Sequence, residues 1–579
     1  MYWVEKPKSA LIRSQATKIC STESILIWEH PCLVFIFFVK PPSLHHPLVP
    51  VKPTNNPPIM RNLRPSLYFG IALVATITTE SLASSDGNWP IWRGTSHTGV
   101  VEGAVPPIEW SDTQNIRWKT EIPGSGLSTP IVWGDQIFIL TAVSKETRPT
   151  NSAEQAQAQR PRPRPEGGLQ GGPSGPGARG AFNREQILKE FDKDGDGQLS
   201  GDERAAMRAQ FRERRGPGGP GRAVPGGGGR PNRGGGGPRG GGRPSPEEHE
   251  FQVISIDRQS GQFNWTQAAN TLTPHEGHHP THGYASASPT TDGKHLWVSF
   301  GSRGIYCYTL DGELVWETDL GDMRTRVGFG EALQPVIAGQ HLLLTWDHED
   351  QSYLIALDKS TGKEVWRKER DERTSWTTPV IVEVGGQTQA IIAGTNRTRA
   401  YDPENGDLIW EASGLTSNVI PTPVIGHGNV YVTSGYKGRS VQAIKLDSKG
   451  DVTGTDNIVW SAPHSAPYVA SPVLSEGRLY MTKGTDAYLT CFNALSGDVI
   501  YQDEKLDGIN GIYASPIVAN GHIYIAGKEG TTVVIKDSAS YEVVASNTLD
   551  EPIDASPVII GNDLLIRGHK HLYCISEDS

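Results

Sequence analysis

The chain has 579 residues, of which 36% are hydrophobic, and its formal net charge is −10 at pH 7. This length and apolar content are sufficient to bury a large core, either in several small domains or in one large repetitive domain. The net negative charge argues against nucleic-acid binding by the protein as a whole.

Residues 60–83 have the features of a secretory signal peptide. Two arginines follow Met60, an apolar run extends over 67–78, and the small residues before and at Ala83 suit cleavage after it. We expect residues 1–59, which are rich in proline, to be a non-native extension ahead of the true start. An uncleaved anchor is the alternative, but the apolar run is shorter than the ~20 residues that a bilayer span needs. We therefore expect a periplasmic or extracellular protein without a stable membrane span.

Three cysteines lie beyond the predicted signal peptide, namely Cys307, Cys491 and Cys574. Each lies in a short apolar segment that is typical of a β-strand. We therefore expect small buried side chains, and neither a disulfide nor a metal site.

One short phrase recurs along the chain: a small residue, a proline, β-branched residues, a glycine turn and an apolar strand. Examples are "STPIVWGDQIFIL" (128–140) and "ASPIVANGHIYIAG" (514–527), and there are eight copies. The prolines of the last seven copies, at 289, 335, 379, 423, 472, 516 and 557, are 41 to 49 residues apart. This period has room for four short strands, as in one blade of a β-propeller.

A second phrase follows within most repeats: a strand, an aspartate, a glycine turn and a strand that ends in tryptophan, as in "YLIALDKSTGKEVW" (353–366). A large ring at the same place in successive sheets favours packing between neighbouring blades. The residues in this position are Trp265, Trp316, Trp366, Trp410, Trp460 and Tyr501.

The last repeat ends at Ser579 before an outer strand can form. "NIRWKTEI" (115–122), with Trp118 in the expected position, precedes the first copy and can supply that strand. A blade made from both ends of the chain would close the ring and remove exposed sheet edges. The sequence therefore predicts an all-β fold, an eight-bladed β-propeller.

These phrases resemble the pyrroloquinoline-quinone-type, or quinoprotein-like, repeat family over residues 87–145 and 249–579. The opening "NWPIWRGTSHTGV" (88–100) is similar to the entry segment of secreted propellers that resemble the propeller subunit of the outer-membrane assembly machinery. The resemblance implies the fold and an interaction role in the cell envelope. The family's enzymes also imply an alternative, a dehydrogenase of alcohols or sugars that uses pyrroloquinoline quinone.

The first two copies are separated by a long insertion, which we expect within blade one. We predict an entry segment and the start of blade one over 84–145, a disordered linker over 146–180, a helical EF-hand over 181–215 and a Gly/Pro/Arg-rich linker over 216–248. Residues 249–579 would then form the remainder of the propeller. A surface loop tolerates such an insertion because the entropy of loop closure grows slowly with length.

The stretch "FDKDGDGQLSGDE" (191–203) resembles the EF-hand calcium loop. Calcium needs several oxygens around a sharply turned backbone, and the spacing supplies them: three carboxylates, a main-chain carbonyl, and a glutamate that binds through both oxygens. The predicted ligands are Asp192, Asp194, Asp196, Gln198 and Glu203, with Ser200 holding a water. The chain shows no second such loop, so the hand would bind Ca²⁺ weakly unless it pairs with another molecule.

Between 214 and 243, seven arginines lie among glycines and prolines without an acidic residue. A flexible linker and a contact with an anionic envelope polysaccharide are both compatible with this composition. Nucleic acid is not expected as a partner of an exported protein.

A histidine-rich loop, "HEGHHPTHGYAS" (275–286), precedes blade two. His275, Glu276, His278, His279 and His282 suit a transition metal by residue type. Their spacing matches no zinc signature, and a polar channel rim is the plainer interpretation.

The family's enzymes carry an adjacent-cysteine pair and a catalytic aspartate at the channel, and this sequence has no adjacent cysteines. We therefore expect a non-catalytic interaction scaffold that binds calcium and contacts envelope or secreted proteins. The quinone-dependent dehydrogenase remains the alternative.

Overall fold

The computed structural model describes residues 29–30, 33–34, 87–145 and 244–577, and the chain falls into two compact units, Met1–Thr79 and Glu80–Ser579. In the first unit, the described residues form two short antiparallel strands, β1 (Glu29–His30) and β2 (Leu33–Val34). In the described ranges, we find no helix that is long and apolar enough to cross a membrane. The predicted signal peptide and the predicted EF-hand lie outside the described residues.

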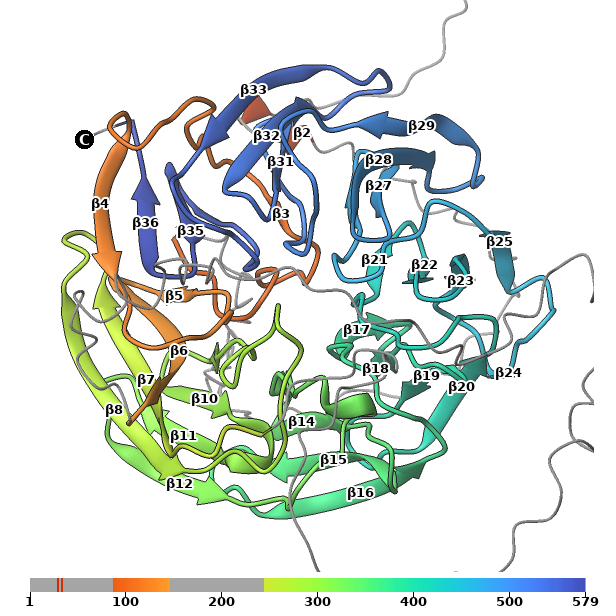
Figure 1. The fold of residues 1–579 in the computed structure, drawn as a ribbon. Coiled ribbons are helices and arrows are strands. Elements are labelled where there is room, and N and C mark those ends of the chain that lie inside the picture. The colour runs from red at the N-terminus through yellow and green to blue at the C-terminus, as the bar shows by residue number, and fades with distance from the viewer. Residues whose placement is uncertain (1–28, 31–32, 35–86, 146–243, 578–579) are drawn as a thin grey trace, which may run out of the picture. The chain divides into compact units, whose positions relative to one another are not determined.

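In the second unit, eight sheets, each with four antiparallel strands, are arranged around a centre, as predicted (Figure 1). Blade one contains β5 (Ile131–Trp133), β6 (Gln136–Ser144), β7 (His249–Asp257) and β8 (Phe263–Leu272). Blade two contains β9 (Thr290–Thr291), β10 (His295–Ser299), β11 (Ile305–Thr309) and β12 (Leu314–Thr318). Blade three contains β13 (Val336–Ala338), β14 (His341–Trp346), β15 (Ser352–Asp358) and β16 (Glu364–Arg370). Blade four contains β17 (Val380–Val384), β18 (Gln387–Ile392), β19 (Thr398–Tyr401) and β20 (Leu408–Ala412).

The remaining blades follow in chain order. Blade five contains β21 (Val424–Gly426), β22 (Asn429–Ser434), β23 (Ser440–Lys445) and β25 (Ile458–Ala462). Blade six contains β26 (Val473–Ser475), β27 (Arg478–Lys483), β28 (Asp486–Asn493) and β29 (Val499–Lys505). Blade seven contains β30 (Ile517–Ala519), β31 (His522–Ala526), β32 (Thr531–Lys536) and β33 (Val543–Thr548). Blade eight contains β34 (Val558–Ile560), β35 (Asp563–Arg567), β36 (His571–Ile575) and, from the other end of the unit, β4 (Ile116–Glu121).

The ring closes in blade eight as the sequence predicted. Strand β4 lies beside β36 and pairs with it antiparallel (Figure 1). In this pair, Trp118 lies opposite Cys574. Two short strands add to other sheets: β3 (Val100–Val101) pairs with β30, and β24 (Gly450–Asp451) pairs with β20. Closure leaves no long sheet edge at the junction of the first and last repeats.

Middle strands are buried on both faces because each blade is packed between two others. All six residues of β14 are buried, whereas the outer strand β16 has exposed side chains along most of its length. Such strands read as apolar runs in place of an alternating pattern. The three cysteines of the propeller lie in this core, and burial raises the pKa of each thiol to about 12.

Five of the repeated tryptophans join one blade to the next. In each case the indole Nε1 donates a hydrogen bond of 2.7 to 3.1 Å to a carbonyl in the next blade's glycine turn. Trp316, for example, donates to Lys359 and covers Gly362, where an added Cβ would lie 2.5 Å from the ring. These tryptophans are Trp118, Trp265, Trp316, Trp366 and Trp460. The predicted packing of these rings between blades is confirmed. The hydrogen bond from each indole was not predicted from the sequence.

A second set of inter-blade bonds lies near the centre of the ring and links blades four to eight and blade one. The hydroxyl residue before the repeated proline accepts a hydrogen bond from the backbone N–H of the equivalent residue in the preceding blade, at 2.9 to 3.2 Å. The chain of bonds runs from Thr378 through Thr422, Ser471, Ser515 and Ser556 to Thr129. It joins the starts of the inner strands of these six blades.

Candidate functional site

Two kinds of loop open on one end of the propeller, which we call the mouth face. His249 pairs with both Ser144 and Leu272, so the end of β6, the start of β7 and the end of β8 lie together. The same antiparallel order holds in the other blades. The mouth face therefore carries the loops between second and third strands and the loops that lead to the next blade. The long insertion of blade one departs from this face.

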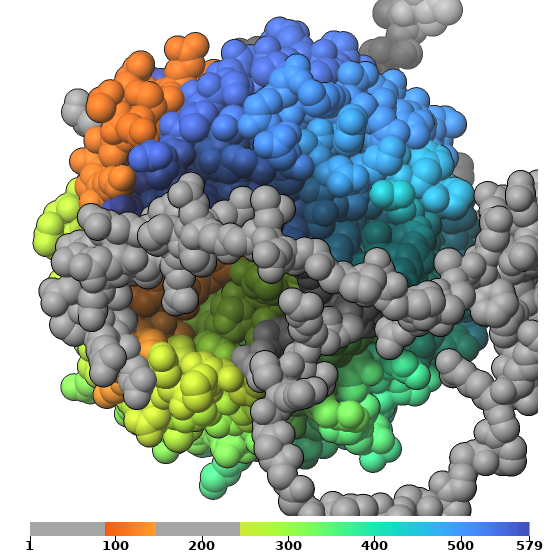
Figure 2. Space-filling view, in the orientation of Figure 1, coloured from red at the N-terminus to blue at the C-terminus, as the bar shows by residue number. Residues whose placement is uncertain are grey.

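A cavity of about 370 Å³ lies at the centre of the mouth face, and Figure 2 shows the second unit hollowed there. Blade-linking loops supply most of its walls. The entry segment (88–101) pairs with β5 through Trp89 and with β30 through Val100 and Val101, at the far end of the channel. From this segment, Trp92 contributes to the floor of the cavity. Its larger side chains are mostly aromatic: Trp92, Phe329, Trp376, Tyr436, Tyr468 and Tyr513. The sequence did not reveal this convergence because the six rings lie far apart in the chain.

Several hydrogen-bonding atoms around the cavity are already bonded to other protein groups, whereas Asp554 Oδ1 is buried without a partner. Trp376 donates from Nε1 to the Gly330 carbonyl at 2.8 Å, and Trp92 donates to Ser556 Oγ at 3.4 Å. The hydroxyls of the inner ring accept backbone N–H groups, as described above. Ring faces are therefore the main surface that the cavity offers to a ligand.

Two members of the histidine-rich loop line this cavity, as expected for a channel rim. Burial lowers the pKa of His282 to about 3, and it also lowers that of His279. The Nδ1 atom of His282 lies 2.7 Å from Ser286 Oγ. Both imidazoles are therefore neutral at physiological pH, and they add to the uncharged character of the walls.

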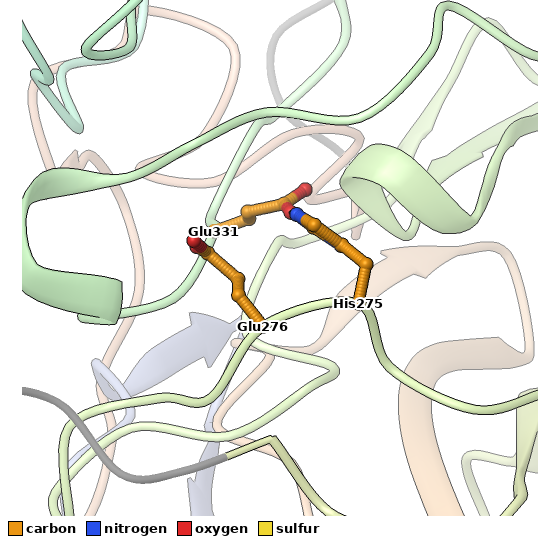
Figure 3. Close-up of side chains that lie close together, drawn as sticks. All are labelled: His275, Glu276 and Glu331. Carbon is orange, nitrogen blue, oxygen red and sulfur yellow. The ribbon is translucent and has the colours of Figure 1, made fainter. Parts of the chain in front are cut away.

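Other members of the loop meet a different group of side chains. His275, Glu276 and Glu331 offer ligand atoms that all lie within 4.8 Å of one another (Figure 3). Within the described ranges, this is the cluster of histidine and carboxylate groups that is compact enough for a metal ion. His278 lies apart from it, with its ring edge-on to Tyr284 at 4.6 Å.

The contacts of this cluster show that it also joins loops of blades two and three. Glu276 accepts hydrogen bonds from the backbone N–H and hydroxyl of Thr325, and Glu331 accepts both corresponding bonds from Ser302. His275 Nε2 lies 2.5 Å from the Met323 carbonyl. Because the protein's own donors occupy the carboxylate oxygens, we interpret the cluster as a polar joint and assign no metal to it.

Burial raises the pKa of Glu331 to about 7, against the opposing effect of its two bonds from Ser302. His275, whose Nε2 is 3.5 Å from Glu331 Oε1, also opposes the shift. The joint therefore contains a carboxyl group that titrates near neutral pH.

The predicted calcium ligands Asp192, Asp194, Asp196, Gln198 and Glu203 lie outside the described residues, as does the arginine-rich segment. The predicted ligand set and linker therefore remain predictions from the sequence. The structure places the cavity at the mouth face and shows where the insertion joins blade one.

Fold and site together define an eight-bladed β-propeller with an aromatic cavity at the mouth of its channel. The family model described as outer membrane protein assembly factor BamB matches residues 249–503. Over these residues the chain matches the pyrroloquinoline-quinone-type propeller family that its repeats resemble.

Several solved structures are similar to this chain. BamB from Moraxella catarrhalis is 13% identical, with 57% of this chain and 95% of that chain covered, at a TM-score of 0.41. Quinohemoprotein alcohol dehydrogenase from Comamonas testosteroni is 8% identical, with 85% and 81% covered, at a TM-score of 0.47. The computationally designed Ika8 protein is 8% identical, with 57% and 93% covered, at a TM-score of 0.41. No curated protein sequence matches the chain.

Proposed function

We propose that this protein is an exported, calcium-binding propeller that binds envelope or secreted proteins at its mouth face and catalyses no reaction there. The observation that carries the proposal is the aromatic cavity at the point where loops of the blades converge. A concave, apolar site surrounded by loops is suited to receive a side chain of a partner. The match to the BamB family model supports a location in the envelope.

The titratable groups of the cavity support a binding role. His279 and His282 have lowered pKa values, and Asp554 is held by His569 Nε2 at 2.9 Å. A general base is most effective when its pKa lies near the working pH and it reaches the substrate. His282, with a pKa of about 3 and its Nδ1 beside Ser286, is poorly suited to this task.

The alternative function, a quinone-dependent dehydrogenase, requires residues that are absent from the described lining of this channel. The sequence has no adjacent cysteines, and Asp554 is the one carboxylate among the described residues that line the cavity. A quinone with bound calcium needs several oxygen ligands. The lining residues therefore do not fit pyrroloquinoline quinone with bound calcium, and we propose no reaction that uses it.

A direct comparison separates the two functions. The mature protein is given pyrroloquinoline quinone and calcium, and its absorbance and the reduction of a dye with alcohols and sugars are measured. We expect neither the absorbance of a bound quinone nor dye reduction. Either signal, at a stoichiometry of one quinone per chain, would contradict a non-catalytic role.

Retention of partners tests the binding role. We expect the immobilised protein to retain specific proteins from a solubilised envelope extract, and Phe329→Ser at the cavity to lose them. Leu495→Ser is the matched control, because Leu495 is an exposed apolar side chain at the turn between β28 and β29, away from the mouth face. Equal retention by both variants would show that the cavity is not the contact.

Calcium binding is proposed for the EF-hand loop in the insertion. We expect one Ca²⁺ per chain, with a dissociation constant on the order of 10⁻⁴ to 10⁻³ M, as in extracellular modules. Asp192→Ala and Glu203→Ala each remove ligand oxygens and should abolish the binding seen by calorimetry. Wild-type affinity in both variants would refute the assignment, and Asp486→Ala in the propeller is the control for loss of charge.

A further inference from the structure

Basic side chains lie on the aromatic rings that border the cavity. Lys528 Nζ is 3.8 Å from the centre of the Tyr513 ring, and Lys437 Nζ is 5.4 Å from that of Tyr436. Both lysines belong to loops between the second and third strands of their blades, which open on the mouth face. Such cation–π contacts hold an ammonium group over a ring while leaving its other side open.

These charges lack acidic partners among the described residues. No carboxylate of the described ranges lies within 4.0 Å of Lys528, Lys437 or Arg326, whereas many other basic groups of the propeller are paired, Lys483 with Asp503 among them. Burial raises the pKa of Tyr468 at the cavity, and the charge of Arg326 opposes this rise. The mouth therefore bears unpaired positive charge in a chain whose net charge is −10.

The acidic groups nearby do not cancel this charge by direct contact. Asp554, on the cavity wall, is bonded to His569, and Glu529 accepts a hydrogen bond from the Asn510 backbone. An anionic ligand is thus favoured at the rim, while the interior favours an apolar group.

The hydrogen bonds that Trp92, Trp376 and the inner hydroxyls already make favour one of two kinds of anionic ligand. A sugar acid would bring several hydroxyl groups into the cavity, and each would need a partner there to offset its desolvation. Trp92, Trp376 and the hydroxyl ring already use theirs within the protein. An aromatic or large aliphatic side chain needs no such partner and gains from burial against ring faces.

We propose that the mouth face binds an acidic peptide segment of a partner protein, which inserts one aromatic or large aliphatic side chain into the cavity and places carboxylates beside Lys528, Lys437 and Arg326. This inference rests on the proposed function and names the chemistry of the partner. The cavity of about 370 Å³ suits one such side chain as an anchor, and the basic rim sets the sign of the flanking charge.

Calorimetry with short synthetic peptides on the full chain tests the proposal. The probes are the pentapeptide Asp-Glu-Trp-Glu-Asp, its variant with Ser in place of Trp, and its variant with Lys in place of each acid, all with blocked ends. We expect the first to bind at least tenfold more tightly than either variant. Its affinity should fall as salt is raised from 50 to 200 mM, because the rim charges are exposed.

Variants of the rim assign the charge. Lys528→Gln and Lys437→Gln should each weaken the acidic peptide about three- to tenfold and leave the melting temperature unchanged, since Lys437 is exposed, Lys528 is half-buried, and neither is paired with a described carboxylate. Lys363→Gln, in the exposed turn between β15 and β16 at the opposite end, is the matched control and should have no effect.

Several outcomes would overturn the inference. These are binding of none of the peptides, equal binding of the Ser or Lys peptide, or equal effects of the rim and control variants. Tighter binding of tetragalacturonate, an acidic oligosaccharide, than of the acidic peptide would identify a polysaccharide site in place of a protein site. If the peptides fail while envelope proteins are still retained through Phe329, the proposed function stands and only this inference falls.

Discussion

Glu331 is a carboxyl group whose acidity is strongly altered by the fold. Its carboxyl group is buried in the joint between blades two and three, and its pKa is raised from 4.5 to about 7. Between these two values the folded protein holds a proton that the unfolded chain releases, so stability falls as the pH rises through this window. This contribution to stability is therefore fully present below pH 4.5 and is lost as the pH rises to about 7.

Glu331→Gln should remove this pH dependence. The amide cannot ionise, and its oxygen can still accept a bond from Ser302, so we expect the variant to gain stability over wild type above pH 7, by up to about 3 kcal/mol. Thermal unfolding measured from pH 5 to 8 provides the check. Glu313→Gln, at an exposed turn, serves as control, and a wild-type pH profile in Glu331→Gln would show that the buried carboxyl is not the cause.

At the scale of the element, the tryptophan and glycine turn form a clasp between blades. Gly362 has φ +71°, and an added Cβ would lie 2.5 Å from the Trp316 ring. We expect Gly362→Ala to lower the free energy of unfolding by roughly 2 to 4 kcal/mol, through the collision and the left-handed backbone. Gly385, with φ +59° and open space around it, isolates the backbone cost. Equal losses in the two alanine variants, measured by denaturant unfolding, would argue against the clasp.

The hydroxyl before each proline is the second inter-blade device. Ser515 Oγ accepts the Ser471 N–H at 2.9 Å, and both groups are buried. Ser515→Ala should leave that N–H without its partner and cost about 1 to 3 kcal/mol. The exposed Ser496→Ala is the control, and an unchanged unfolding midpoint for Ser515→Ala would refute the role of the ring.

At the scale of the whole molecule, the sequence predicted the repeat, the number of blades and the closing strand. The spacing of the repeats and their recurring residue pattern are sufficient for this prediction, because every blade packs against its neighbours through the same residue types. Trp410 shows where the pattern fails: it fills the expected position, yet its Nε1 donates to Gln389 within the same blade at 3.0 Å. The next blade has a longer connection there, with β24, in place of the short glycine turn.

The candidate site was much less predictable than the fold. The histidine-rich loop was evident in the sequence, but its residues lie in two different places. His279 and His282 line the cavity, whereas His275 and Glu276 belong to the joint. Lys528 and Lys437 carry no local signal except a basic residue beside a glycine after the second strand. Their common position is a property of the closed ring, which brings together loops that are about 90 residues apart in the chain.

Closure of the ring through β4 and β36 makes a further prediction for the whole propeller. A chain that ends at Lys570 lacks β36 and leaves blade eight without the partner of β4. We expect this truncation to expose sheet edges, to aggregate and to lose its cooperative unfolding transition. Removal of only 577–579 should leave the transition in place, and a soluble, cooperatively folding truncation at Lys570 would contradict closure as a requirement.

The central claim is that the mouth face is the partner-binding face of this propeller. The most direct measurement is photo-crosslinking in intact cells, with a photoreactive residue at Glu529 on the mouth face or at Leu495 at the opposite end, both exposed. We predict a discrete adduct with an envelope or secreted protein from Glu529, lost when Phe329 is changed to Ser, and none from Leu495. Adducts from Leu495 alone, or the same adducts from both positions, would contradict the account.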